Sequence, residues 1–387
     1  MKLKNKQEKK IKSLNYLSAK EARAISKKNR RITDELEKKK KRKNVPVEEY
    51  TSTMKNPKNV LEVENLNTYF FTDLGTVKAV AGASFEVEKG KTLGIVGESG
   101  CGKSVTSLSI MQLVQRPQGQ TVEGAIRFDS GKGVYDIAKA PTEFMQKIRG
   151  NMISMIFQEP MTSLNPVFRV GMQVDEVIGL HNPEMSKEDI KKRTLEMLDL
   201  VGIANSEGVY KMYPHELSGG MRQRVMIAMA LACDPSLIIA DEPTTALDVT
   251  IQAQILDLLR NLKDKINSSI MLITHDLGVI AEMADMVVVM YAGKVVEKGT
   301  AADIFKNPKH PYTIGLMESK PVVNKNVERL YSIPGKVPNP INMPNYCYFK
   351  DRCEKCIEAC NGPYPREIKL SDTHYVSCYL YNDEEVK

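Results

Sequence analysis

A phosphate-binding loop is the feature that most constrains the fold of this chain. Residues 97–104 read Gly-Glu-Ser-Gly-Cys-Gly-Lys-Ser; an apolar run, Thr92–Val96, precedes them and a helical segment, Val105–Val114, follows. A strand, a Gly-rich turn and a helix N-terminus in this order surround phosphate oxygens with backbone N–H groups. We expect Lys103 to reach the β- and γ-phosphates and Ser104 to offer its hydroxyl to Mg²⁺. The predicted nucleotide-binding residues are Gly97, Glu98, Ser99, Gly100, Cys101, Gly102, Lys103 and Ser104.

A second motif places two carboxylates at the end of a buried strand. Residues 236–240 are small or apolar and lead directly into Asp241 and Glu242. Asp241 can orient Mg²⁺ through its water shell, and Glu242 at the strand end can polarise a water for attack on the γ-phosphate. The two motifs together predict a nucleoside triphosphatase.

Short apolar runs recur between residues 60 and 320, as expected for strands buried on both faces. Helical segments separate several of them, which predicts an α/β domain with a mainly parallel sheet. The runs are Thr92–Val96, Met152–Phe157, Leu237–Ala240, Ile270–Ile273 and Met286–Met290. Val60–Leu66 and Ala83–Val87 are predicted to be half-buried antiparallel strands. No strand is expected between residues 170 and 225, where helices near Met172–Leu180 and Lys187–Val201 predict a helical insertion.

The charge is distributed unevenly along the 387 residues. Residues 1–57 hold 19 Lys or Arg and seven Asp or Glu, whereas the remainder carries 36 basic and 41 acidic groups. A solvated tail is the favoured interpretation of residues 1–43, and a basic, weakly amphipathic helix that contacts anionic lipid or RNA is the alternative. Its apolar stripe is Ile11, Leu14, Ala22, Ile25, Ile32 and Leu36, interrupted by Ser18 and Asn29. Residues 44–57 are expected to form a linker.

Composition excludes some classes of protein. With 27% charged and 42% hydrophobic residues, the chain is too apolar for wholesale disorder and too charged for a polytopic membrane protein. No apolar stretch approaches the roughly 18 residues of a spanning helix, and no apolar segment follows the basic start as in a secretory signal. We therefore expect the protein on the cytoplasmic side.

A third motif lies between the two phosphate motifs, at the start of a predicted helix. It comprises Leu217, Ser218, Gly219, Gly220 and Met221, and it resembles the signature motif of ABC ATPases, with Met in place of a Gln. The order of motifs in residues 60–320 resembles an ABC-transporter nucleotide-binding domain throughout. That resemblance implies two such domains closing head to tail, so that the signature motif of one faces the ATP of the other.

The same resemblance assigns further site residues. Gln158 corresponds to the Q-loop glutamine, which positions the γ-phosphate and joins Ser104 and Asp241 around Mg²⁺. Asp248, in Ala246-Leu247-Asp248, corresponds to the D-loop, and His275 to the switch histidine. Phe70 stands where the family places the aromatic side chain that stacks on adenine, and Tyr69 is the neighbouring candidate.

The chain further resembles the ATPase subunits of oligopeptide/dipeptide permeases, which include nickel-importing relatives, and is most like the D-type subunit. The residues that carry this resemblance are the loop with Val105-Thr106, residues 161–166 (Met-Thr-Ser-Leu-Asn-Pro), 308–313 (Pro-Lys-His-Pro-Tyr-Thr) and 333–338 (Ile-Pro-Gly-Lys-Val-Pro). It implies peptide import with two transmembrane permease subunits, a second paralogous ATPase and an extracytoplasmic binding protein. Import of dipeptides or nickel is the rival within the family. A soluble ABC ATPase acting on ribosomes or nucleic acid is the rival outside it, although such proteins usually carry two ATPase domains.

Five of the seven cysteines lie in the last 41 residues. In a cytosolic chain such a group is typical of a metal or iron–sulfur site rather than of disulfides. The resemblance implies a four-cysteine ligand set for a 4Fe–4S cluster, at Cys347, Cys353, Cys360 and Cys378. A four-cysteine zinc site and unligated thiols are the alternatives, and Cys356 departs from the family pattern.

The predicted organisation has three parts. Residues 1–57 form the basic extension and linker. Residues 58–320 form a P-loop ABC ATPase domain with a mainly parallel sheet, an antiparallel β-subdomain and a helical subdomain at about 170–226. Residues 321–387 form a Pro- and Cys-rich C-terminal region, too small to hold a core of its own without a metal or similar constraint.

Overall fold

A computed structural model describes residues 18–158, 163–245, 248–319 and 331–381 of the chain. Its central layer is an eight-stranded sheet in the order β11-β12-β10-β9-β3-β8-β7-β6, and β6, β7, β8, β3 and β9 run parallel. The strands are β3 (Thr92–Val96), β6 (Ile153–Ile156), β7 (Leu237–Asp241), β8 (Ser269–Ile273), β9 (Met286–Tyr291), β10 (Lys294–Thr300), β11 (Ile368–Lys369) and β12 (Tyr375–Val376). All five predicted core strands are therefore confirmed.

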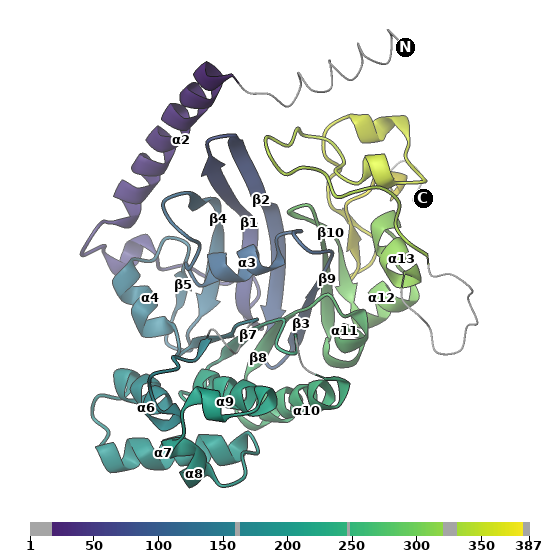
Figure 1. The fold of residues 1–387 in the computed structure, drawn as a ribbon. Helices are drawn as coiled ribbons and strands as arrows, with labels where there is room; N and C mark the ends of the chain where they lie inside the picture. The colour runs from purple at the N-terminus through teal and green to yellow at the C-terminus, as the bar shows by residue number, and fades with distance from the viewer. Residues whose placement is uncertain (1–17, 159–162, 246–247, 320–330, 382–387) are drawn as a thin grey trace.

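A second, antiparallel sheet lies beside the first in the order β2-β1-β4-β5 (Figure 1). The strands are β1 (Asn59–Thr72), β2 (Gly75–Glu88), β4 (Gly119–Asp129) and β5 (Val134–Asp136). The predicted antiparallel pair is confirmed, but both strands are longer than their apolar cores because polar residues continue the ladder to the turn at 73–74. Neither β4 nor β5 is predicted from the sequence.

A group of four helices occupies the lower part of Figure 1. They are α6 (Val170–His181), α7 (Lys187–Leu200), α8 (Ser206–Lys211) and α9 (Gly219–Leu231). Residues 170–225 are all described and hold no strand, as predicted. The other α-helices among the described residues of the ATPase body are α3 (Lys103–Ile110), α4 (Thr142–Ile148), α10 (Val249–Lys265), α11 (Leu277–Met283), α12 (Ala301–Lys306) and α13 (Pro311–Glu318). Mainly parallel sheet, antiparallel sheet and helical layer together confirm the predicted fold class.

The interpretation of the basic N-terminal segment as a solvated tail is wrong for residues 19–40. They form helix α2 (Ala19–Lys40), which begins at a capping box made by Ser18 and Glu21. Asn29 is buried and its Nδ2 donates to the carbonyl of Thr72 at 2.8 Å. The two polar residues that interrupt the stripe thus cap the helix and dock it on the antiparallel sheet. Ile11 and Leu14 of the stripe lie outside the described residues.

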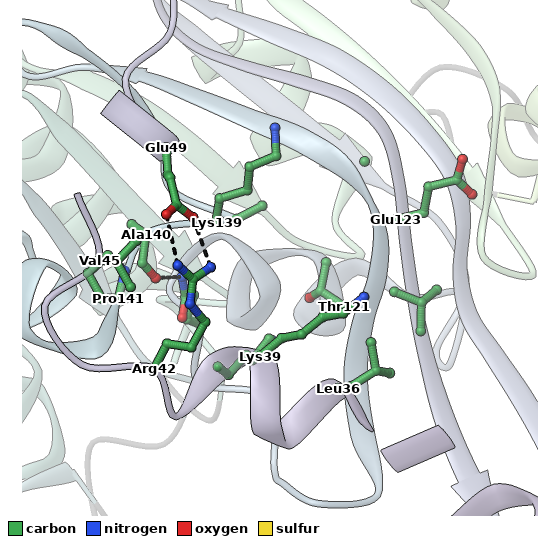
Figure 2. A pocket seen from close by; sticks show the side chains of 15 residues that line it. Leu36, Lys39, Arg42, Val45, Glu49, Thr121, Glu123, Lys139, Ala140 and Pro141 are labelled. Carbon is green, nitrogen blue, oxygen red and sulfur yellow. Dashed lines mark hydrogen bonds and ion pairs between the residues drawn. The ribbon is translucent and has the colours of Figure 1, made fainter. Parts of the chain in front are cut away.

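The expected linker also contributes to the core. Tyr50 is only 5% exposed and packs against the rings of Tyr135 and Phe144 at centroid distances of 6.0 and 4.9 Å. A cavity of about 530 Å³ lies between this segment, the end of α2 and strand β4 (Figure 2). Arg42 at its wall is held by both carboxylate oxygens of Glu49, each at 2.8 Å. This cavity lies beyond the C-terminal end of α3, whereas the phosphate loop leads into the helix's N-terminus.

The C-terminal region shares the core of the ATPase body, contrary to the expectation that it needs its own constraint. Strand β12 pairs with β10 and so extends the central sheet. Met343, Tyr348 and Phe349 are buried in the same hydrophobic cluster as the residues of β7, β8 and β9. The physical premise for a metal as the only source of order is therefore wrong. Among the described helices none is both long enough and apolar enough to cross a membrane.

Candidate functional site

The phosphate loop connects the buried strand β3 to helix α3, and two of its glycines are required by close backbone approach. A Cβ on Gly97, whose φ is +153°, would lie 2.2 Å from the carbonyl oxygen of Met290. A Cβ on Gly102, whose φ is +102°, would lie 2.3 Å from the carbonyl oxygen of Ala79. Only glycine tolerates both the left-handed backbone and these contacts. Ser99 and Gly100 are exposed at the turn.

The side chain of Lys103 lies along the inside of this loop. Its Nζ donates to the carbonyl oxygens of Gly97 at 2.7 Å and Glu98 at 3.2 Å. Cys101 is 1% exposed, and burial raises the pKa of its thiol. It therefore fills space as a neutral thiol, as its position in the motif predicts.

Asp241 ends strand β7 directly beside the first turn of α3. Ser104 Oγ donates to its Oδ1 at 3.1 Å, and Ser107 Oγ donates to its Oδ2 at 3.3 Å. Burial raises the pKa of Asp241 above its usual range. A buried carboxylate next to a hydroxyl, both hard oxygen donors, fits Mg²⁺, which binds through one or two carboxylates together with substrate phosphates.

Glu242 is the point at which the predicted catalytic residues meet. Gln158 Nε2 donates to Glu242 Oε2 at 2.9 Å, and His275 Nδ1 lies 3.2 Å from Glu242 Oε1. The structure thus brings together three residues that are separated by 84 and 33 positions in the sequence. Their side chains converge because Gln158 follows β6, Glu242 follows β7 and His275 follows β8, three adjacent parallel strands.

The groups around Glu242 keep its carboxylate ionised. Burial raises its pKa, but hydrogen bonds from His275 and Thr245, with the charges of His275 and Lys103, outweigh burial and leave the pKa of Glu242 below its usual range. Its φ is +48°, a left-handed conformation that is uncommon outside glycine and is found at functional sites. The carboxylate is therefore ionised at neutral pH and able to accept a proton.

The signature motif lies apart from this centre. Ser218 caps α9 by accepting a hydrogen bond from the backbone N–H of Met221, Leu217 is buried, and Ser218 and Gly219 are exposed. Asp248 caps the neighbouring helix α10 in the same way. In the part of the chain that the structure describes, no hydrogen bond or ion pair joins residues 217–221 to the phosphate loop. Ala246 and Leu247 of the D-loop lie outside the described residues.

Phe70 lies in the antiparallel sheet. It is half-buried in β1, opposite Val77 of β2 and Gly119 of β4, and its ring occupies the space that a Cβ on Gly119 would fill. Tyr69 donates through its hydroxyl to Asn67 Oδ1 at 3.0 Å. Neither contact joins the phosphate loop, so the adenine-stacking role remains a prediction.

The four predicted ligand cysteines come close together without forming a metal site. Burial, followed by the nearby thiols of Cys360, Cys378 and Cys353, raises the pKa of Cys347 to about 12. Burial likewise raises the pKa of Cys378 to about 11. Among the described residues, which include all four cysteines, no three His, Cys, Asp or Glu side chains are arranged to hold a metal ion. Among these residues there is thus no preformed ligand set for the expected iron–sulfur cluster or for zinc.

Four residues at the site were not predicted from the sequence motifs. Ser107 and Thr245 each follow a recognised motif by three positions and hydrogen-bond Asp241 and Glu242. Two others come from the C-terminal third and contact Glu98. Tyr312 accepts a hydrogen bond from the Glu98 backbone N–H at 2.8 Å, and Arg352 pairs with the Glu98 carboxylate at 2.7 Å. Tyr312 lies in the family-like segment 308–313, and this resemblance could have indicated that it matters for the site. For Arg352 the sequence offers only its position next to Cys353.

Two families match the sequence. Residues 80–245 match the ABC transporter family, and residues 296–360 match the C-terminal region of oligopeptide/dipeptide transporters. The chain is 51% identical over 325 residues to the oligopeptide transport ATP-binding protein AppD of Bacillus subtilis, covering 84% of this chain and 98% of that protein. It is 50% identical over 328 residues to the dipeptide transport ATP-binding protein DppD of Lactococcus lactis, covering 85% and 93%.

Solved structures agree with these relatives. The ATP-binding cassette MJ0796, described as a dimer bound to ADP and phosphate, superposes with a TM-score of 0.55 at 26% identity over 62% of this chain and 98% of that one. CbiO1 from Clostridium perfringens superposes with a TM-score of 0.54 at 28% identity over 65% and 92%. With the phosphate loop, the paired acids and the converging Gln158 and His275, these similarities show that the chain is an ATPase that belongs to the ABC transporter ATP-binding subunits of the oligopeptide/dipeptide family.

Proposed function

We propose that this protein hydrolyses ATP to energise the import of oligopeptides through a membrane permease. The observation that carries the proposal is the convergence of Gln158 and His275 on the Glu242 carboxylate beside the phosphate loop. The names of the relatives, which are oligopeptide and dipeptide transport ATP-binding proteins, support the choice of peptide as the transported solute.

The proposed roles follow from the contacts of each side chain. Lys103 turns from the loop carbonyls to the β- and γ-phosphates of ATP, since these oxygens carry the higher charge. Ser104, Asp241 and Gln158 would hold Mg²⁺, Asp241 through the water shell of the ion, and the bound ion would neutralise charge on the phosphates. Glu242 accepts the proton of the attacking water, and His275 fixes the orientation of the Glu242 carboxylate.

A second nucleotide-binding domain completes the proposed site. Ser218 and Gly219 at the N-terminus of α9, and Asp248 at that of α10, are exposed and Gly220 is partly so, which leaves them available to a partner's ATP. The dimeric structure of the similar cassette MJ0796 supports this arrangement. We propose a paralogous ATPase as the partner, with the group α6–α9 and the segment after Gln158 receiving two transmembrane permease subunits.

The proposal places the protein on the cytoplasmic face of the membrane as a peripheral subunit, with an extracytoplasmic binding protein delivering the solute. It is tested by co-expressing the chain with the proposed permease subunits and second ATPase and measuring peptide-stimulated ATP hydrolysis in proteoliposomes. Oligopeptides are expected to stimulate turnover, and Lys103→Ala, as the matched control, to abolish it. Stimulation by dipeptides or nickel alone would favour the rival importers. Sedimentation with ribosomes, without permease subunits, would contradict the transport function.

For the C-terminal cysteines we propose a 4Fe–4S cluster on Cys347, Cys353, Cys360 and Cys378, with zinc as the alternative. The mutual proximity of the four thiols supports it. Holding a cluster requires their side chains to turn toward one centre and lose their protons, and the cluster would then cross-link a Pro-rich segment. Anaerobically purified protein should contain about four irons per chain and lose them in Cys353→Ser, with the exposed Cys356→Ser as control. Protein that carries neither iron nor zinc when kept reduced would contradict the proposal.

For the basic helix α2 we propose contact with anionic lipid head groups. Each basic side chain near such a surface contributes about 1 kcal/mol, screened by salt. Because Asn29 docks α2 on the protein, charge rather than apolar insertion has to carry the contact. Flotation with phosphatidylserine vesicles should be lost in a Lys38→Ala, Lys39→Ala, Lys41→Ala variant and retained in the matched acidic-residue variant Glu35→Ala. Equal flotation of both variants would contradict it.

A further inference from the structure

The phosphate loop is bound from outside the nucleotide motifs by one arginine. Arg352 Nη1 donates to Glu98 Oε2 at 2.7 Å, and Nη2 donates to Oε1 at 3.0 Å, although the two residues are 254 positions apart. This is the two-pronged geometry in which a guanidinium holds a carboxylate most firmly. Glu98 is the second residue of the loop, so the contact acts on the turn that surrounds the phosphates.

Arg352 is itself held on several sides. Its Nε donates to the carbonyl of Pro334 at 2.9 Å, and Nη1 reaches the Tyr291 hydroxyl at 3.3 Å. The guanidinium also lies over the rings of Tyr291 and Phe349, 5.7 and 5.8 Å from their centroids. Arg352 is 7% exposed. A side chain fixed in this way has little freedom left to lose, so it can impose a position on the more exposed Glu98.

The backbone of Glu98 is fixed at the same time. Its N–H donates to the hydroxyl of Tyr312, which is fully buried, and its carbonyl oxygen accepts from Lys103 Nζ. Tyr312 is oriented in turn by the hydrogen bond from its N–H to His310 Nδ1. The carboxylate and the amide of Glu98 are thus both tied to the C-terminal third of the chain, and its carbonyl contacts the lysine expected to bind phosphate.

We infer that Arg352 is a positioning residue for ATP binding, acting through Glu98 on the phosphate loop. This rests on the ATPase function proposed above. Backbone N–H groups that are held in place before ATP arrives need not be ordered on binding, and that ordering otherwise weakens affinity. The loop contacts phosphate in both the ground state and the transition state, so loss of Arg352 should raise KM for ATP and leave kcat nearly unchanged.

A purely structural role makes a different prediction. If the ion pair only attached the C-terminal region to the body, its loss would lower thermal stability without selectively changing ATP affinity. The division of the effect between KM and kcat therefore separates the two roles. The coupling between the two residues in ATP affinity then tests whether Arg352 acts through Glu98.

The experiment compares Arg352→Gln, Arg352→Lys, Glu98→Gln and the double variant Arg352→Gln/Glu98→Gln in the full chain. Binding of a fluorescent mant-ATP is titrated for each, and KM and kcat are measured in the assembled transporter. The matched control is Lys369→Gln, which removes an exposed ion pair with Asp372 in the same region. Arg352→Gln should weaken mant-ATP binding by about 10- to 100-fold, the range for losing hydrogen bonds between charged groups.

The other variants should follow from the geometry. Lysine keeps the charge but lacks the planar fork, so Arg352→Lys should fall between wild type and Arg352→Gln. The double variant should bind no more weakly than Arg352→Gln, because Arg352 acts only through Glu98. Lys369→Gln should match wild type.

Three outcomes would overturn the inference: unchanged affinity in a folded Arg352→Gln, a loss of kcat without a rise in KM, or additive effects in the double variant. Should Arg352→Gln not fold, the same criteria apply to Glu98→Gln and Arg352→Lys. Wild-type protein that fails to bind mant-ATP would instead refute the nucleotide site, and the inference with it.

Discussion

Replacing Glu242 with glutamine tests the centre of the site most directly. The substitution keeps the size of the side chain but removes the carboxylate that we propose takes the proton of the attacking water. Because its hydrogen bonds lower the pKa of Glu242, the wild-type carboxylate is ionised at neutral pH and ready to act. Glu242→Gln should therefore bind ATP normally and hydrolyse it very slowly.

The magnitude follows from the contacts of the carboxylate. Loss of a general base costs about 10²- to 10⁴-fold in rate, or about 2.7–5.4 kcal/mol in the activation free energy. In addition, one oxygen that accepts hydrogen bonds becomes an amide nitrogen. It then faces either Gln158 Nε2 and Thr245 Oγ1 or the ring nitrogen of His275. We therefore expect turnover to fall by at least about 100-fold.

Phosphate release at saturating ATP measures turnover, and mant-ATP titration measures binding. Thr245→Val is the matched control, because it removes one hydrogen bond to Glu242 but leaves the base in place. Its turnover should fall by less than about 10-fold, since a modest rise in the pKa of Glu242 leaves the carboxylate ionised at pH 7.5. Wild-type turnover in Glu242→Gln, in the assembled complex, would refute the assignment of the base.

Two further predictions concern the loop and its support. Gly102→Ala should abolish mant-ATP binding, because its Cβ would lie 2.3 Å from the Ala79 carbonyl oxygen. Gly100 also has a positive φ but has open space around it, so Gly100→Ala should bind mant-ATP within about 10-fold of wild type. Equal loss of binding in both variants would contradict the steric argument. Burial lowers the pKa of His310 to about 3, so the unfolded chain binds more protons below about pH 6.5 and stability should fall by about 2 kcal/mol between pH 7.5 and pH 5. In His310→Asn, which keeps an acceptor for the Tyr312 N–H but cannot titrate, urea unfolding should lose that part of the pH dependence; an unchanged dependence would count against it.

Local sequence determined the parts of the site that depend on backbone conformation and burial. Glycines at 97 and 102 allow the loop to turn, and the apolar run before Asp241 specifies a strand buried on both faces. Such signals lie within a few residues of one another, so the sequence predicts them without knowledge of the fold. The roles of Gln158 and His275 followed only from their order along a family-like chain. The structure adds that adjacent parallel strands bring both onto Glu242.

Tertiary structure alone decided how the ends of the chain join the body. A polar residue in an apolar stripe indicates either a weak helix or a contact that docks the helix on the protein. Only the position of the Thr72 carbonyl in the folded structure shows that Asn29 makes a docking contact. Likewise nothing near Arg352 in the sequence indicates that its partner is Glu98, 254 residues earlier. Hydrogen bonds of this kind depend on the distance between atoms after folding, which residue type and local spacing do not encode.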